Sequence, residues 1–249
     1  MPTTIESIRA KFRKRKRARL PNTAGTEFAI YMSACYDLAL KSYETKFKEE
    51  KHLKFKNPER IVVSNFIVNC VSALETYFKN TILQNARWYN PGLTSLLKEK
   101  ITLGEAYEMF GQEKISREYI VSHYISLQNF ESISAIFSKL TNTDFFKEVE
   151  SFKVDWDGQM LTLLEELPDW RSEIIQLYDV RNRYVHDNVI ERLSKRDIPI
   201  IFDRVYAFQI YIEEWVESKY SLIQQYEARL TKTKRIKNSL MAKPLKGSK

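Results

Sequence analysis

Residues 201–226 have the sequence IFDRVYAFQIYIEEWVESKYSLIQQY, in which apolar side chains recur at steps of mostly three or four. This spacing places them on one face of an α-helix, because a helix has about 3.6 residues per turn. Asp197 and Pro199 come just before and are typical of a helix start. The stretch therefore predicts a long amphipathic helix with a near-heptad apolar face. That face holds Ile201, Val205, Phe208, Ile212, Trp215, Leu222 and Tyr226.

The same helical period occurs in four earlier parts of the chain. Asn57 and Pro58 separate the first two, and the third is expected to end near Asn142, with Asp144 restarting the chain. Asp169 is a candidate N-cap for the fourth. The predicted helices cover residues 26–49, 58–87, 116–140 and 170–193.

Between these helices, residues 88–169 are expected to form an irregular insert. Short helices are expected within residues 93–115, and residues 151–169 are expected to be a connector whose acids and glycine form turns. The sequence Asp-Trp-Asp-Gly at 155–158 does not fit a calcium loop. Aligning its glycine would put Lys153 and Leu164 at the first and last ligand positions.

The composition indicates one all-α domain. The chain has only 6 glycines and 7 prolines in 249 residues, which disfavours turn-rich all-β folds. We expect an antiparallel helical bundle over residues 21–228. Cys35 and Cys70 are expected to be buried free thiols, which fits a reducing compartment. Since we expect neither a membrane span nor a signal peptide, the predicted location is cytoplasmic.

The positive charge is concentrated at the two ends of the chain. Residues 1–20 hold eight Lys/Arg and one acid, a charge of +7, and residues 229–249 hold eight Lys/Arg and no acid, a charge of +8. The total is +8, so residues 21–228 carry 8 − 15 = −7. Two basic extensions on an acidic body suggest a polyanionic partner such as RNA, although solvated tails would have the same composition.

Of the three histidines, one belongs to a dense polar motif. His52 lies in a charged turn and His123 beside an apolar helix face, so both are interpreted as surface or flanking residues. His186 belongs to LYDVRNRYVHDN (177–188), where two arginines, an amide, a phenol and an imidazole fall within six residues. Arg181, Asn182 and His186 are therefore candidates for phosphate chemistry.

Helix geometry limits how these three residues can cooperate. Asn182 and His186 are one turn apart on the same face, whereas Arg181 and His186 differ by about 140°. Either the helix distorts here, or the arginine and histidine meet partners from a second copy of the helix across a two-fold axis. Arg181 falls on the stripe expected to face inward, which holds Ile174, Tyr178, Val185 and Val189.

A plainer interpretation is that the motif is ordinary helix surface. We accept it for Arg183 and for the aspartates at 179 and 187, which have the spacing of weak ion pairs between residues four apart. For Arg181, Asn182 and His186 the spacing alone leaves both interpretations open.

The order Arg181-Asn182-Arg183-Tyr184-Val185-His186 resembles the Arg-x4-6-His signature of the HEPN (higher eukaryotes and prokaryotes nucleotide-binding) superfamily. The earlier segment VSALETYFKNTI (71–82), with Glu75 before two aromatic residues, also resembles an early helix of that family. The resemblance covers these two helices and extends to the rest only through the helical pattern.

The resemblance implies a bundle that dimerises with the two motifs facing each other, and RNA cleavage without a metal or other cofactor. His186 would act as general acid or base at the ribose 2′-hydroxyl or the leaving oxygen, Arg181 would hold the phosphate, and Asn182 would orient one of them. Tyr184 is a possible auxiliary residue. Glu75 is another, as an acid that would fix Arg181 or His186, although a surface pair with Lys79 is the slightly favoured interpretation.

Many ribonucleases of that family are toxins or antiviral effectors, so the resemblance also implies a possible antitoxin or sensor partner. Two alternatives stay open. The first is an inactive HEPN-like module that binds RNA, nucleotides or protein. The second is a helical scaffold that docks through its basic ends. Other catalytic classes are disfavoured, because the sequence has neither a glycine-rich phosphate loop nor a Cys/His cluster at zinc spacing.

Overall fold

The computed structural model describes residues 24–44, 58–85, 92–96, 125–156, 158–187, 189–190, 194 and 196–241. The side chains of residues 43–44, 58–59, 85 and 220–241 are outside this description. The described part of the chain is mostly helical and contains a single two-stranded sheet. The predicted all-α fold class is confirmed.

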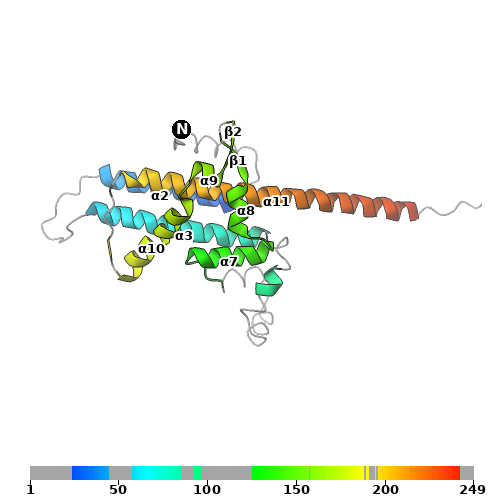
Figure 1. Ribbon diagram of the computed structural model, residues 1–249, viewed down its shortest axis with the longest axis horizontal. Helices are drawn as coiled ribbons and strands as arrows, with labels where there is room; N and C mark the ends of the chain where they lie inside the picture. The colour runs from blue at the N-terminus through cyan, green and yellow to red at the C-terminus, as the bar shows by residue number, and fades with distance from the viewer. Residues whose placement is uncertain are drawn as a thin grey trace, which may run out of the picture.

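Three long helices form the centre of the molecule: α2 (Ala24–Glu44), α3 (Pro58–Asn85) and α11 (Asp197–Met241) (Figure 1). Ring contacts fix their directions. Tyr36, late in α2, packs against Phe66 and Phe202, near the starts of α3 and α11. Phe28, early in α2, packs against rings further along both helices. Helix α2 is therefore antiparallel to α3 and α11, as a bundle requires.

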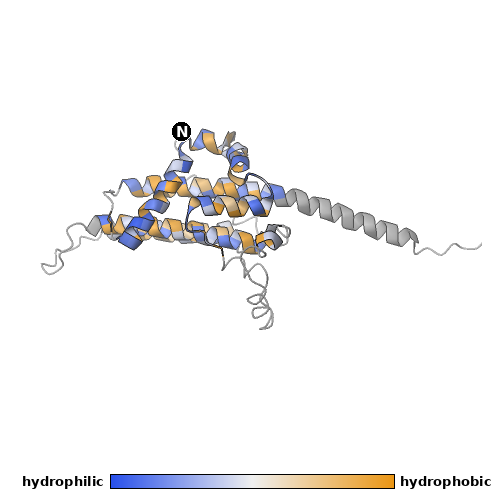
Figure 2. Cartoon of the chain, turned by 60° about the horizontal axis from the view of Figure 1, so that its bottom comes forward, coloured by the Kyte–Doolittle hydropathy of each residue, from blue (hydrophilic) through white to orange (hydrophobic). Residues whose placement is uncertain are grey.

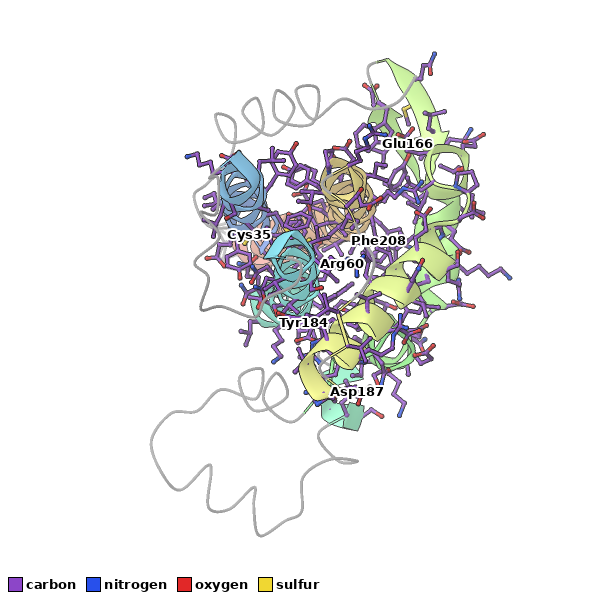
Figure 3. The ribbon with its side chains drawn as sticks, turned by 90° about the vertical axis from the view of Figure 1, so that its left-hand side faces the viewer. Cys35, Arg60, Glu166, Tyr184, Asp187 and Phe208 are labelled. Carbon is purple, nitrogen blue, oxygen red and sulfur yellow. The ribbon has the colours of Figure 1, made fainter. Side chains whose placement is uncertain are left out.

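Helix α10 (Trp170–Asp187) crosses this bundle diagonally (Figures 1 and 3). Its first residue, Trp170, stacks on Phe208 of α11, and Glu173 forms an ion pair with Arg204 of α11. Its last turns lie beside α3 instead. This crossing carries the polar motif from the α11 side of the bundle to the α3 side.

A cluster of aromatic rings joins α10 to the shorter helices α7 (Phe130–Thr141) and α8 (Phe145–Ser151). Phe146 stacks on Phe130 at a centroid distance of 4.4 Å and lies 5.4 Å from Trp170. Phe145 contacts Trp215 of α11 edge to face at 5.2 Å. Hydrophobic residues of this kind recur along the helices (Figure 2) and are buried between them. The resulting core anchors the start of α10.

The helix predicted over residues 116–140 begins later than expected. Residues 125–129 are not helical, and α7 starts at Phe130, because the Asn129 side chain accepts a hydrogen bond from the Ser132 amide at 2.7 Å and caps the helix. Residues 116–124 are outside the described residues. The predicted restart at Asp144 is confirmed, since its carboxylate caps α8.

The connector expected at residues 151–169 contains a β-hairpin, which the sequence did not predict. Strand β1 (Lys153–Trp156) pairs antiparallel with β2 (Gln159–Thr162). Within the turn, the Gly158 amide donates to the Asp155 carboxylate at 2.8 Å, and Gly158 has a φ of 88°. The prediction that Asp155 forms a turn is confirmed. Thr162 then caps the one-turn helix α9 (Leu163–Glu166).

The hydroxyl of Tyr211 attaches this hairpin to α11. It accepts a hydrogen bond from Trp156 Nε1 at 2.7 Å and lies 3.1 Å from the carbonyl oxygens of Leu161 and Thr162, within donating distance of both. An isolated two-stranded hairpin is only marginally stable in water. The contacts with the buried Tyr211 explain why this one persists.

Gly25 allows α2 to approach α11 closely. A Cβ atom at this position would lie 2.7 Å from Cδ of Glu213 and 2.9 Å from Nε2 of Gln209. Glu213 is buried and accepts a hydrogen bond from the Tyr77 hydroxyl of α3 at 2.9 Å. The absence of a side chain at Gly25 therefore leaves room for a polar contact between α3 and α11.

The sequence led us to expect no uncharged stretch long enough to span a membrane, and one helix bears on that expectation. Residues 60–84 of α3 form one helix, within the described part of the chain, that is long and apolar enough to cross a membrane. However, 56% of its most apolar window is buried inside the protein, where it packs against α2, α10 and α11. Core helices of soluble proteins have the same composition, so the helix is weak evidence for a membrane location.

The two cysteines have different environments. Cys70 is fully buried in α3, whereas Cys35 of α2 is only partly buried, and both are free thiols. Burial raises the pKa of both thiols. The predicted free thiols are confirmed, and the predicted burial is complete for Cys70 alone.

Replacing Asp203 of α11 with asparagine is expected to stabilise the protein by about 1 kcal/mol at pH 7, after allowing for solvent screening. Partial burial raises the pKa of the Asp203 carboxyl from 3.8 to about 6, and its Oδ1 has no hydrogen-bond partner among the described residues. Between these two values the native state binds more protons than the unfolded state, so stability falls as the pH rises.

Urea unfolding at pH 4 and pH 7 measures this effect. The gain in Asp203→Asn should be present at pH 7 and absent at pH 4, where the native carboxyl is mostly protonated. Asp144→Asn, which keeps a capping side chain on α8, is the control. An equal gain from Asp203→Asn at both pH values would contradict the assignment.

Candidate functional site

Arg181 lies in the interface between α10 and α3, where two side chains hold its guanidinium group. Its Nη2 forms an ion pair with Oε1 of Glu75 on α3 at 3.7 Å, and its Nη1 donates a hydrogen bond to Oδ1 of Asn182 at 2.8 Å. The side chains of Arg181 and Glu75 are only 15% and 17% exposed. Arg181 is thus a fixed cation near the surface, unlike a freely solvated arginine.

Glu75 lies in this interface, and its carboxylate interacts with Arg181 as well as with Lys79. The sequence had slightly favoured a surface pair with Lys79. Burial raises the pKa of the Glu75 carboxyl, and the positive charges of Arg181 and then Lys79 oppose that rise. The alternative interpretation, in which Glu75 fixes Arg181, has the better geometry.

Hydrogen bonds in this interface are incomplete. Oε1 of Glu75, Nε of Arg181 and the hydroxyl of Tyr178 are buried without hydrogen-bond partners among the described residues. Burial, followed by the nearby Glu75 charge, raises the pKa of Tyr178. Unsatisfied buried polar atoms are uncommon in native proteins and are costly. Their concentration around Arg181 marks this interface as a polar site that an anion or water molecules could complete.

Tyr184 connects the last turns of α10 to α3. Its hydroxyl donates a hydrogen bond to Oδ1 of Asn65 at 3.1 Å, and Figure 3 shows Tyr184 between the two helices, with Asp187 at the far end of α10. This contact holds the motif against α3. The structure gives Tyr184 a positioning contact.

His186 lies on the opposite, exposed side of α10. Among the described residues no hydrogen bond reaches its imidazole, and it borders an open groove of about 600 Å³. Asn182 borders the same groove, whereas Arg181 does not. The lining comes entirely from α10, and consists of Gln176, Asp179, Asn182, Arg183, His186 and Asp187.

The structure therefore does not bring Arg181 and His186 together within one chain. Helix α10 is regular α-helix through the motif, so the distortion that the sequence allowed does not occur. Two of the sequence-based interpretations are compatible with this geometry: a second copy that supplies the missing residue, and an ordinary helix surface. Asn182 is the only candidate that contacts Arg181 and also shares the groove with His186.

The inward stripe predicted for this helix is correct only in its first half. Ile174 and Tyr178 are buried, but Val185 and Val189 are 46% and 42% exposed. Helix α10 ends at Asp187, before the predicted residue 193. Because the helix crosses the bundle diagonally, its last turn lies outside the bundle core. Exposed apolar side chains therefore flank His186 on either side in the sequence.

Several other predictions lie partly or wholly outside the described residues. His52, His123 and the basic segment 1–20 are not described, and residues 229–241 are described only as the last backbone turns of α11. Figure 1 shows α11 running past the other helices at this end. Within the described residues, no group of three or more His, Cys, Asp or Glu side chains is arranged to hold a metal ion.

Comparison with known proteins assigns no family to this chain. No family model, curated protein sequence or solved structure matches it.

Proposed function

We propose that the protein is a metal-independent endoribonuclease whose active site is completed by a second copy of the chain. The observation that carries the proposal is the arrangement around Arg181. A guanidinium group is held by Glu75 and Asn182, and Asn182 lies one helical turn from the exposed imidazole of His186. A fixed guanidinium suits a phosphate oxyanion, and an imidazole suits proton transfer near neutral pH.

In this proposal His186 acts on a proton and Arg181 stabilises charge. The imidazole accepts the proton of a ribose 2′-hydroxyl or donates one to the leaving 5′-oxygen. The 2′-oxygen attacks the adjacent phosphorus and the P–O5′ bond breaks, which leaves a 2′,3′-cyclic phosphate and a 5′-hydroxyl. Arg181 stabilises the additional negative charge on the phosphoryl oxygens.

Self-association is part of the proposal, because Arg181 and His186 lie on different sides of α10. A two-fold axis near the end of α10 would bring His186 of one copy toward Arg181 of the other. The exposed apolar residues Val185, Val189 and Ile190 surround His186 in the sequence and are suited to such a contact. The basic ends of the chain would add sequence-independent attraction for RNA.

A toxin or antiviral effector with a neutralising or sensing partner is the biological role that the HEPN resemblance suggests, and the cytoplasm is the location that the sequence suggests. A second candidate function is an inactive module of the same kind that binds RNA, nucleotides or protein. It is favoured by the His186 imidazole, which no described hydrogen bond orients. Catalytic histidines are usually held by such a partner.

The nature of the RNA ends tests the proposed function. Purified protein is incubated with total RNA in excess EDTA, and the fragments are analysed for terminal groups. We expect cleavage that persists in the chelator and produces 2′,3′-cyclic phosphate ends, because no step uses a metal. Cleavage that requires a divalent ion, or that leaves 5′-phosphate ends, would contradict the mechanism. RNA binding without cleavage would favour the inactive module.

A further inference from the structure

A second pocket, separate from the groove beside His186, lies between α2 and α3. It has a volume of about 340 Å³, at the lower end of the roughly 300–1,000 Å³ typical of small-ligand sites. Aromatic rings and small side chains form most of its lining, with Phe28, Tyr31 and Tyr77 among the rings and Ala73 among the small residues. A flat aromatic ligand matches a cavity of this size and lining.

The polar side of this pocket is formed by Glu27 and Asn80. Nδ2 of Asn80 donates a hydrogen bond to Oε2 of Glu27 at 2.8 Å, which fixes the amide beside the carboxylate. The second N–H of that amide stays available as a donor, and the carboxylate oxygens have further lone pairs. The pair therefore presents one donor next to two acceptors.

The Watson–Crick edge of guanine is complementary to this arrangement. Guanine offers the acceptor O6 followed by the donors N1–H and N2–H, in the same order as the Asn80 amide and the two Glu27 oxygens. Adenine has no N1–H donor, and hypoxanthine lacks the 2-amino group. Guanine is thus the base that can satisfy both side chains while its rings contact Phe28 and Tyr31.

The position of the pocket relative to Arg181 connects it to RNA. Viewed down the axis of α3, four residues lie in order from the α10 side to the α2 side, separated by angles of about 40° to 60°. They are Glu75, Lys79, Thr76 and Asn80. Thr76 and Lys79 are exposed, so the surface between the two sites is open. A short single strand crossing this face could place one base in the pocket and a phosphate near Arg181.

We infer that the pocket between α2 and α3 binds an unstacked guanine base of a single-stranded RNA, recognised by Glu27 and Asn80. The link to RNA rests on the proposed ribonuclease function, whereas the recognition of guanine rests on the pocket alone. Binding and cleavage can therefore be tested separately.

Ligand-observed NMR with the 5′-monophosphates of guanosine, inosine and adenosine tests the recognition of guanine. The three probes share the ribose and phosphate, so binding through phosphate cancels. We expect the guanosine nucleotide to bind about tenfold more tightly than the inosine nucleotide and the adenosine nucleotide to bind more weakly still, because each missing donor removes a hydrogen bond to the charged Glu27 carboxylate. Equal binding of all three would overturn the inference.

Two variants and one control assign the binding to this pocket. Glu27→Gln should lower the affinity for guanosine monophosphate about tenfold. Thr76 lies at the exposed rim of the pocket, so Thr76→Phe should abolish binding by filling the pocket. Glu131→Gln, an exposed glutamate in the first turn of α7, should bind as wild type does. Melting temperatures identify any variant that is misfolded. Unchanged binding in folded Thr76→Phe would also overturn the inference.

Cleavage of synthetic RNAs with and without guanine distinguishes the two proposals. If guanosine monophosphate binds selectively but no RNA is cut, the ribonuclease proposal fails and the guanine site stands. If RNA is cut with no dependence on guanine, and guanosine monophosphate binds no more tightly than the other two nucleotides, the guanine site is overturned and the ribonuclease stands.

Discussion

His186→Ala is expected to lower the rate of RNA cleavage by about 10²- to 10⁴-fold, the contribution typical of a general acid or base. Stability should change little, because the side chain is exposed and makes no hydrogen bond with the described residues. RNA binding should also be retained. Rates on a defined oligonucleotide, together with a binding isotherm, measure both quantities. Equal cleavage by wild type and His186→Ala would remove His186 from the mechanism.

Arg181→Ala is expected to impair cleavage at least as strongly and to destabilise the protein as well, since it removes the cation that interacts most strongly with the largely buried Glu75 carboxylate. The double variant Glu75→Gln/Arg181→Ala should recover stability without recovering cleavage, which separates the two effects. Arg171→Ala is the matched control. It removes an exposed arginine about 15 Å away along the same helix.

Mixing the two inactive variants tests whether the site is composite. If Arg181 of one copy works with His186 of the other, a mixed dimer of Arg181→Ala and His186→Ala has one intact site. Half of the dimers are mixed after random exchange, so about a quarter of wild-type activity should return. No recovery in mixtures shown to contain the mixed dimer would mean that both residues act from the same chain.

Trp170→Ala is expected to cost about 3–5 kcal/mol of unfolding free energy. The indole is 1% exposed and packs against Phe130, Phe146 and Phe208, so its removal leaves a cavity where four helices meet. Urea unfolding followed by far-ultraviolet circular dichroism measures the loss. Since this ring anchors the start of α10, the motif at the other end should also lose its position.

Trp170→Phe provides the matched comparison. The indole Nε1 is buried without a hydrogen-bond partner among the described residues, so losing that N–H removes a penalty and offsets part of the lost packing. We expect a cost well below that of alanine. A phenylalanine variant as unstable as the alanine variant would show that the indole N–H is satisfied in solution.

The long helices could be predicted because their apolar residues recur over many turns. In α11 the buried apolar residues extend from Ile198 to Val216, and such a run determines the helix whatever its neighbours are. The hairpin could not be predicted in this way. Each strand has four residues, so the alternation that buries Val154 and Trp156 is too short to distinguish from a loop. Its stability comes from Tyr211, about fifty residues later in the sequence.

For the candidate site, the sequence predicted the residues of the motif but not their surroundings. A helical projection put Val185 on the buried stripe, because a projection assumes that the whole helix packs against the core. The diagonal crossing of α10 leaves its last turn outside, and Val185 is exposed. The sequence offered both Arg181 and Lys79 as partners of Glu75 and slightly favoured Lys79. Lys79 is close in sequence, whereas Arg181 is brought near only by the fold.

The contact at Gly25 limits how this sequence can vary in evolution. A methyl group there would displace Glu213, and the hydrogen bond from Tyr77 would be lost with it. A substitution at position 25 is therefore expected to require substitutions at positions 77 and 213, which lie on two other helices. In an alignment of homologous chains, the three columns should change together, with a larger residue at 25 accompanied by a shorter one at 213.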